Sequence, residues 1–295
     1  MEIKRIMVIG AGFMGSGIAQ VMAAAGHEVV LGDTAEEFIA RGRSAIAKNL
    51  AGQVAKGKLS EADREVLIGR IKPTTELASA HGCDLIIEAI IENKQAKLDL
   101  FRQLEEICPP QVIFASNTSS IPITELATAT RRPDKFAGMH FFSPVPVMKL
   151  VEIIRGLKTS DATIRVIRDL TDRIGKIGVS VKDGPGFLVN RVNAALRNEV
   201  YNCLAEGVAT IEDIDKALKF GLGHPMGPFE LGDFVGLDIG LAVAETLWDN
   251  FKDPKWRPSL LLKKLVASGD LGRKTGKGWY DYSGGEKKTR TDISL

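Results

Sequence analysis

Residues 5–33 read RIMVIGAGFMGSGIAQVMAAAGHEVVLGD, and this stretch decides the fold. Arg5 to Ile9 is typical of a buried β-strand, and the run Gly10-Ala11-Gly12-Phe13-Met14-Gly15 follows it directly. A helix and a second strand are indicated next, and the second strand ends at Asp33. Glycine runs of this kind are weak evidence alone, but here a strand, a helix and an acidic residue about 20 positions on surround the run. The stretch therefore predicts a βαβ unit that binds a dinucleotide.

The residue types in this stretch also predict which dinucleotide binds. The three glycines of the motif allow a tight turn and let the backbone approach a pyrophosphate, whose charge would lie at a helix N-terminus. Asp33 would accept hydrogen bonds from the adenosine ribose and would repel a 2′-phosphate, so we expect NAD. A glycine-rich turn without a ligand is the less favoured alternative. The predicted cofactor residues in this stretch are Gly10, Gly12, Phe13, Met14, Gly15 and Asp33.

Composition sets the broad class. The chain has 295 residues, which is more than one core usually spans, so two domains are expected. Its apolar fraction of 44% and charged fraction of 26% are ordinary for a soluble globular protein. The net charge of +2 comes without a long basic block, so we expect no nucleic-acid partner. The three cysteines have no metal-ligand spacing, which predicts reduced thiols, a cytoplasmic location and no metal.

The uncharged run at residues 7–26 superficially resembles a signal peptide or a membrane span. Glycines, Ser16 and Gln20 interrupt it, so a strand, a glycine turn and a helix explain it better. We therefore expect no membrane segment.

Strands and helices continue to alternate along the chain. Apolar runs at 84–89, 111–115 and 136–140 indicate further strands. This alternation is typical of a doubly wound, mostly parallel sheet of the Rossmann type in an α/β protein. Ligands of such sheets bind beyond the carboxyl ends of the strands, where Glu92 and the run Asn117-Thr118-Ser119-Ser120 fall.

The pattern changes at Asp183-Gly184-Pro185-Gly186, beyond which only helices are predicted, at residues 187–206, 211–220 and 229–251. We therefore predict an NAD-binding domain over residues 1–184, an all-helical domain over 185–282, and a flexible polar tail over 283–295.

A helical hairpin at residues 34–70 is an addition to a plain dinucleotide fold. Thr34-Ala35-Glu36-Glu37 fits a capping box that opens its first helix, and Ser60 with Asp63 marks the start of its second. Charge alone favours a solvated helix face for its basic residues, which are Arg41, Arg43, Lys48, Lys56 and Lys58.

The stretch 140–154, HFFSPVPVMKLVEII, predicts a hairpin centred near Pro146. His140 and Glu152 are equidistant from its tip, and opposite residues of an antiparallel pair have Cβ atoms about 4.5–5.5 Å apart. A base that takes a hydroxyl proton while a nicotinamide takes the hydride needs a pKa near neutrality, as histidine has. Of the four histidines, only His140 falls at the ligand edge with a carboxylate opposite. We expect Glu152 to orient its ring.

Six segments resemble the 3-hydroxyacyl-CoA dehydrogenase family, and most closely its short monofunctional 3-hydroxybutyryl-CoA members. The resemblance covers residues 3 to about 282. The segments are Gly10–Gly15, Asn117–Ser120, His140–Glu152, Asp183–Phe187 with Asn190-Arg191, His224–Pro228 and Gly272–Tyr280.

The resemblance implies a role for each matching residue. It makes His140 the base and Glu152 its partner, with Ser119 and Asn190 holding the 3-oxygen of an acyl-CoA substrate. It places Glu92, Lys97 and Asn117 near the nicotinamide half of NAD. It also implies that Lys56 meets the coenzyme A phosphates, although Gly52 stands where relatives would have a further lysine.

The resemblance further implies that the helical domain forms a homodimer, and the apolar residues between 229 and 251 agree with this.

The sequence leaves two alternatives to an acyl-CoA dehydrogenase: a relative that oxidises a free sugar acid, and a catalytically silent NAD-binding structural protein. The first would not need the basic hairpin. The second could lose Ser119, His140, Glu152 or Asn190, and the chain keeps all four.

Overall fold

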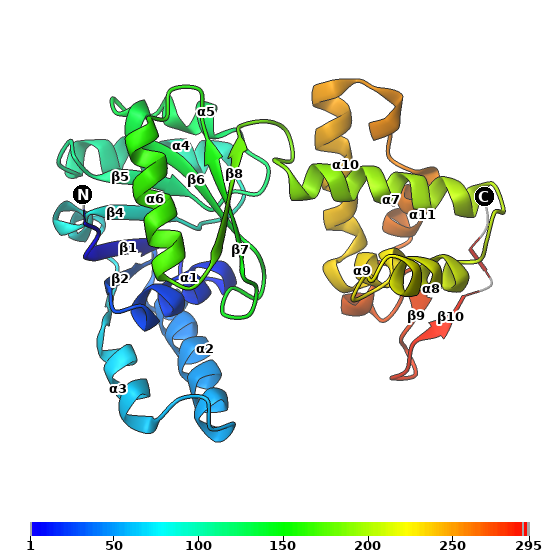
Figure 1. Cartoon of the computed structure of the whole chain (residues 1–295), viewed down its shortest axis with the longest axis horizontal. Helices are drawn as coiled ribbons and strands as arrows, with labels where there is room; N and C mark the ends of the chain where they lie inside the picture. The colour runs from blue at the N-terminus through cyan, green and yellow to red at the C-terminus, as the bar shows by residue number, and fades with distance from the viewer. Residues whose placement is uncertain (1, 291, 294–295) are drawn as a thin grey trace. The chain divides into compact units, whose positions relative to one another are not determined.

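The computed structural model describes residues 2–290, 292 and 293, which form two compact units, one up to Gly184 and the other from Pro185 (Figure 1). The first unit contains an eight-stranded sheet in the order β3-β2-β1-β4-β5-β6-β7-β8. All neighbouring strands are parallel except β6 and β7. The predicted fold class is confirmed. The strands are β1 Arg5–Ile9, β2 Glu28–Gly32, β3 Ile71–Thr74, β4 Leu85–Glu88, β5 Ile113–Ser116, β6 Phe136–Phe141, β7 Leu150–Arg155 and β8 Ile177–Lys182.

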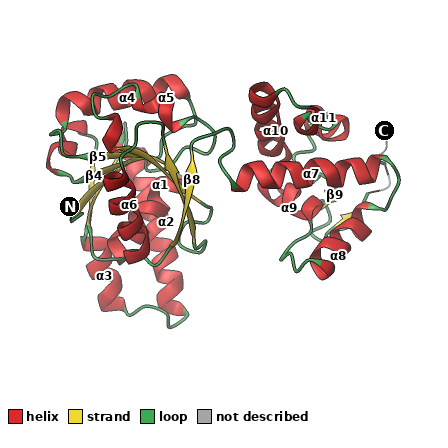
Figure 2. Cartoon of the chain, turned by 45° about the horizontal axis from the view of Figure 1, so that its top comes forward, coloured by secondary structure: helices red, strands yellow, loops and turns green. Residues whose placement is uncertain are grey.

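Helices cover both faces of this sheet (Figure 2). Successive side chains of a strand point to opposite faces. In β5, Ile113 and Ala115 join the core cluster that holds α1, α2 and α6, whereas Phe114 lies 5.8 Å from Phe101 of α4, ring centroid to ring centroid. The helices of this unit are α1 Phe13–Ala24, α2 Glu36–Ala55, α3 Glu61–Gly69, α4 Lys94–Ile107, α5 Ile123–Ala127 and α6 Asp161–Arg173.

The inserted hairpin consists of α2 and α3, and two of its details differ from expectation. The predicted capping box is wrong, because Ala35 is the N-cap of α2 without a side-chain hydrogen bond and the Thr34 hydroxyl donates to Asp33 instead. The Ser60 cap is confirmed, since its Oγ accepts from the N–H of Asp63. Beyond α3 the chain enters β3, a strand that sequence reasoning did not predict.

The second unit is mainly helical, but its elements differ from the prediction: the third predicted helix is divided, the helix Leu260–Ala267 was not predicted, and a short strand lies at Tyr280–Asp281. Residues 229–251 do not form one helix, because Gly236 adopts a φ of 110° between α9 and α10. Leu237, one of the predicted interface residues, is buried in the core of this unit. The helices are α7 Val189–Ala205, α8 Ile211–Gly221, α9 Pro228–Val235, α10 Leu237–Phe251 and α11 Leu260–Ala267.

The segment after α11 closes the core of this unit. The buried Asp233 carboxylate accepts hydrogen bonds from the backbone N–H groups of Trp279 (2.8 Å) and Tyr280 (2.9 Å). Burial raises the pKa of Asp233 to about 6. The following residues form a short antiparallel pair, β9 Tyr280–Asp281 with β10 Lys288–Thr289. The predicted flexible tail therefore includes a paired strand, and its residues 291, 294 and 295 lie outside the described residues.

Within the part of the chain that the structure describes, none of the helices combines the length and apolar character that a bilayer-spanning helix needs.

Candidate active site

The carboxyl ends of the parallel strands bring the predicted site residues of the first unit to one edge of the sheet. β1 ends at the glycine turn, β4 ends at Glu88, β5 ends before Asn117, and β6 ends at Phe141 beside His140. Parallel register places these ends side by side, which is where open α/β sheets bind ligands.

The glycine turn fits a bound dinucleotide. A Cβ on Gly10 would lie 2.4 Å from the carbonyl oxygen of Ala89, and one on Gly15 would lie 1.7 Å from that of Gly10, so both positions require glycine. A Cβ on Gly12 would meet nothing within 4 Å. No described side chain caps α1, so its first N–H groups can receive a pyrophosphate. Phe13 is largely exposed beside this turn, and Met14 is half-buried.

Asp33 connects this turn to the end of β2. Its Oδ2 accepts from the N–H of Ala11 at 2.7 Å, and its Oδ1 accepts from the N–H of Thr34 at 2.7 Å. The carboxylate is half-buried and is therefore positioned by backbone groups while part of it faces solvent. Carboxylate oxygens have further lone pairs, so ribose hydroxyls can still donate to them.

His140 and Glu152 form a close pair. They are direct partners in the antiparallel register of β6 and β7, as the sequence predicted. Nδ1 of His140 lies 2.7 Å from Oε2 of Glu152, and both side chains are buried, that of Glu152 completely. The ring of Phe142 lies 4.6 Å from the imidazole, centroid to centroid. The pair is a histidine whose orientation is fixed by a carboxylate.

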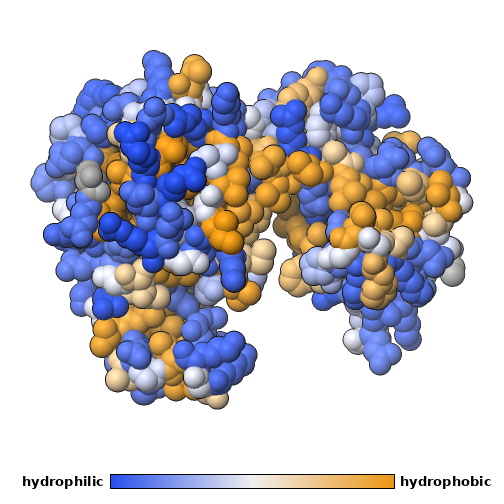
Figure 3. All heavy atoms as spheres, in the orientation of Figure 1, coloured by the Kyte–Doolittle hydropathy of each residue, from blue (hydrophilic) through white to orange (hydrophobic). Residues whose placement is uncertain are grey.

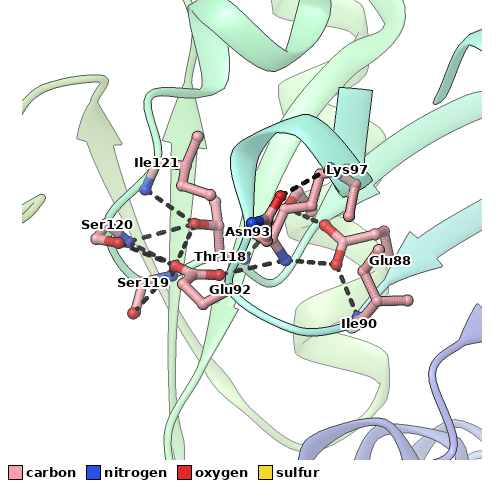
Figure 4. A network of polar contacts seen from close by, with 11 residues as sticks. Glu88, Ile90, Glu92, Asn93, Lys97, Thr118, Ser119, Ser120 and Ile121 are labelled. Carbon is pink, nitrogen blue, oxygen red and sulfur yellow. Dashed lines mark hydrogen bonds and ion pairs between the residues drawn. The ribbon is translucent and has the colours of Figure 1, made fainter. Parts of the chain in front are cut away.

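The loop after β5 lies at the same edge and is held by two groups. Oδ1 of Asn117 accepts from the N–H of Phe141 at 2.9 Å, which connects this loop to the strand of His140. Oε1 of Glu92 accepts from the hydroxyl of Thr118 at 2.6 Å and from the N–H of Ser119 at 2.9 Å. Figure 4 shows Glu92 facing this loop.

Lys97 lies under this loop and not at the surface. Its side chain is 1% exposed, and its ammonium lies 3.2 Å from Oε2 of Glu92 and 2.5 Å from Oε1 of Glu88. Burial alone would raise the pKa of Glu92, but Lys97 and hydrogen bonds from Thr118, Ser119 and Ser120 together lower it. Glu92 is therefore held as a carboxylate.

Glu88 was missed at the sequence level. It is fully buried, although it follows an apolar strand run that indicated only a structural role. The available signal was a carboxylate at a strand end, nine residues before a lysine on the next helix.

The remaining predicted residues lie elsewhere. Lys56 is the exposed C-cap residue of α2, a helix of 20 residues, which places it about 30 Å from the helix start. Asn190 lies on α7, in the second unit. Among the described residues no His, Cys, Asp and Glu side chains gather in a group that could hold a metal ion.

Comparison with known families identifies both units. The model of the 3-hydroxyacyl-CoA dehydrogenase NAD-binding domain matches residues 5–184, and that of the C-terminal domain of the same family matches residues 186–282. The chain belongs to the 3-hydroxyacyl-CoA dehydrogenase family. The resemblance seen in the sequence is therefore confirmed, as is NAD as the cofactor. The sugar-acid alternative is not retained, because both matching models describe dehydrogenases of acyl-CoA.

Individual relatives are similar to this protein along almost the whole chain. A probable 3-hydroxybutyryl-CoA dehydrogenase of Deinococcus radiodurans is 52% identical over 93% of this chain and 99% of the relative. One of Bacillus subtilis is 50% identical over 98% of this chain and 100% of the relative. The crystal structure of (S)-3-hydroxybutyryl-CoA dehydrogenase from Ralstonia eutropha is 46% identical, with a TM-score of 0.93 over 95% of this chain and 99% of that chain.

We predict that Asp33→Ala raises the Kd for NADH about tenfold or more, because a hydrogen bond to a charged group contributes about 1.5–3 kcal/mol. The Kd for NADPH should change less, since NADPH gains relief from charge repulsion. Fluorescence titration of both cofactors measures this. Asp84→Ala is the matched control, because Oδ2 of Asp84 also accepts from two backbone N–H groups, at the opposite edge of the sheet. An equal loss in both variants would contradict the role given to Asp33.

Proposed function

We propose that the protein interconverts (S)-3-hydroxybutyryl-CoA and acetoacetyl-CoA with NAD(H), using His140 and Glu152 as a general acid–base pair. The observation that carries this proposal is the buried 2.7 Å contact between the two side chains, at the carboxyl edge that also holds the glycine turn. The four-carbon substrate is supported by the Deinococcus, Bacillus and Ralstonia relatives, which are all named as 3-hydroxybutyryl-CoA dehydrogenases.

The dyad explains how the proton moves. NAD, when bound, supplies the acceptor for the hydride that leaves the substrate's C3. Nδ1 of His140 donates to Glu152, so Nε2 is the nitrogen that takes the 3-hydroxyl proton in oxidation and returns it in reduction. The carboxylate of Glu152 stabilises the imidazolium as it forms. Ser119 and Asn190 would donate hydrogen bonds to the 3-oxygen, on which negative charge develops.

Neighbouring residues bury His140 and Glu152 and fix their orientation. Glu152 has no access to water, so its charge interacts with the imidazole in a medium of low dielectric constant. Asn117 accepts from the N–H of Phe141, the residue that follows His140, and so restrains the end of β6. The imidazole therefore keeps one orientation, which is what proton transfer to a positioned substrate needs.

We predict that the purified protein reduces acetoacetyl-CoA with NADH, with a higher kcat/KM than for long-chain 3-oxoacyl-CoA. His140→Ala should lower kcat about 10²–10⁴-fold, the usual contribution of a positioned general acid or base, and Glu152→Gln should lose much of the same activity. Steady-state kinetics over an acyl-chain series, together with NADH titration, measure both effects.

His81→Ala is the control for these variants, because His81 is exposed and its Nδ1 lies 3.0 Å from the carbonyl oxygen of Ile107, away from the carboxyl edge of the sheet. Its kcat should equal that of the unmutated protein. Near-normal turnover of His140→Ala would remove the dyad from the mechanism, and a preference for long chains would overturn the proposed substrate.

The basic hairpin is proposed as the binding site for the coenzyme A phosphates. Lys56 and its basic neighbours on α2 are exposed, and Lys56 is remote from the glycine turn. A group this far from the reacting carbon contributes binding that is equal in the ground state and the transition state, which affects KM and not kcat.

Lys56→Glu should therefore raise KM for acetoacetyl-CoA and leave kcat nearly unchanged, most visibly at low salt, because salt screens exposed charges beyond about 8–10 Å. A thioester that lacks the nucleotide should show no effect. Lys158→Glu, the same charge change at an exposed residue beyond the end of β7, is the control. A large fall in kcat would show that the hairpin has another role.

We also propose that the second unit forms a homodimer. Figure 3 shows apolar surface along α7, and this unit exposes several large apolar side chains of the kind that mark protein interfaces. They include Val192, Phe220, Leu222, Phe234, Ile239 and Leu260. Sedimentation velocity at micromolar concentration should show a species of twice the 31.9-kDa chain mass. A single species of the chain mass would refute the dimer.

The cytoplasmic location of the protein stays a prediction.

A further inference from the structure

Glu88 is a buried carboxylate that the proposed reaction does not use directly. It lies at the end of β4, is completely buried, and accepts three hydrogen bonds. The donors are Nζ of Lys97 at 2.5 Å, Oγ of Ser116 at 2.5 Å and the N–H of Ile90 at 2.8 Å. A carboxylate without water is costly unless it is paired and hydrogen-bonded, and Glu88 is both.

Two routes lead from Glu88 to the loop that carries Ser119. On the first, Lys97 bridges Glu88 and Oε2 of Glu92, whose Oε1 accepts from the loop (Figure 4). On the second, Oγ of Ser116 donates to Glu88 and accepts from the N–H of Thr118 at 3.2 Å. The loop is thus held from two sides by groups that meet at one carboxylate.

The charges explain why Glu88 is needed. Glu92 uses one oxygen for Lys97 and the other for five donors from residues 118–120. The ammonium of Lys97 is buried between two carboxylates, those of Glu88 and Glu92. If the charge of Glu88 were removed, Glu92 would remain as the carboxylate partner of Lys97 among the described contacts. Coulomb attraction would then draw Glu92 towards Lys97 and away from the loop.

We propose that Glu88 is a positioning residue for Ser119. It fixes Lys97 and Ser116, so that Glu92 holds the 118–120 loop in the conformation that presents the Ser119 hydroxyl to the substrate's 3-oxygen. This inference rests on the proposed function, because it assigns the consequence of the network to the reaction at that oxygen. A displacement of a reacting group by about 1 Å can cost about 100-fold in rate.

A second buried ion pair in the chain serves as a control, because it is expected to have only a structural role. Glu105 lies on the same helix as Lys97 and forms a buried ion pair with Arg132, with Nε 2.9 Å from Oε2. Both partners are 7% exposed. The pair contacts the carbonyl groups of Cys108 and Pro109 and has no contact with the 118–120 loop in the described network.

The experiment compares Glu88→Gln with Glu105→Gln. Glu88→Gln should lower kcat for acetoacetyl-CoA reduction about 10- to 100-fold while KM for acetoacetyl-CoA stays within about threefold, because the displaced hydroxyl acts at the reacting oxygen. Glu105→Gln should lose thermal stability and keep its kcat. Hydrogen exchange of a peptide that covers residues 117–121 should accelerate in Glu88→Gln only.

A second variant keeps the test decisive if Glu88→Gln does not fold. Ser116→Ala removes one of the two routes with a small change in side-chain volume. It should lower kcat and accelerate exchange at residues 117–121, both by less than Glu88→Gln does. Unchanged exchange at 117–121, or an equal kcat loss in Glu105→Gln, would overturn the positioning role. Faster exchange with unchanged kcat would also overturn it.

Failure of the proposed function has a different signature. If the unmutated protein did not reduce acetoacetyl-CoA, the reaction assigned to the site would be wrong. The exchange measurement would then still decide whether Glu88 orders the loop, because it requires no turnover.

Discussion

The reversal of the last two strands, β7 and β8, in an otherwise parallel sheet is the constraint on which the site depends. β6 ends at the carboxyl edge, and the antiparallel β7 begins there, so Glu152 lies opposite His140 at the edge where ligands bind. A parallel β7 would begin at the other edge and would carry this carboxylate away from the glycine turn. The same edge receives the end of β5, whose Asn117 is hydrogen-bonded to β6.

Buried carboxylates perform different tasks according to their partners. Glu152 faces a histidine, a side chain that can take up and release a proton during a reaction. Glu88 faces a lysine and a serine, which hold its charge in one place. In the second unit, Asp233 accepts from backbone N–H groups and closes a core. Each of these carboxylates must be paired or hydrogen-bonded in order to be buried, and the nature of its partners decides which tasks the group can perform.

Much of the fold and the pairing of His140 with Glu152 could be predicted because local patterns determine them. The glycine turn requires particular residues, and the register of His140 with Glu152 follows from hairpin symmetry. The missed features depend on distant neighbours. β3 contains Pro73, which removes a backbone donor and reads as a strand breaker, yet is tolerated because β3 is the edge of the sheet. Gly236 breaks a continuous apolar pattern, and nothing nearby in sequence shows that its φ is positive. Glu88 reads as the end of an apolar run.

The packing of α2 connects the tip of the inserted hairpin to the glycine turn. A Cβ on Gly42 would lie 2.4 Å from the carbonyl oxygen of Ala11, so α2 approaches the glycine turn as closely as only glycine allows. Ile46 and Leu50 continue this contact into the core next to α1. The start of α2 is therefore packed against the glycine turn, and Lys56 lies at its far end. If the tip of the hairpin binds the coenzyme A phosphates as proposed, a substitution there can change substrate affinity without moving the groups at the carboxyl edge of the sheet, because the length of α2 sets the separation.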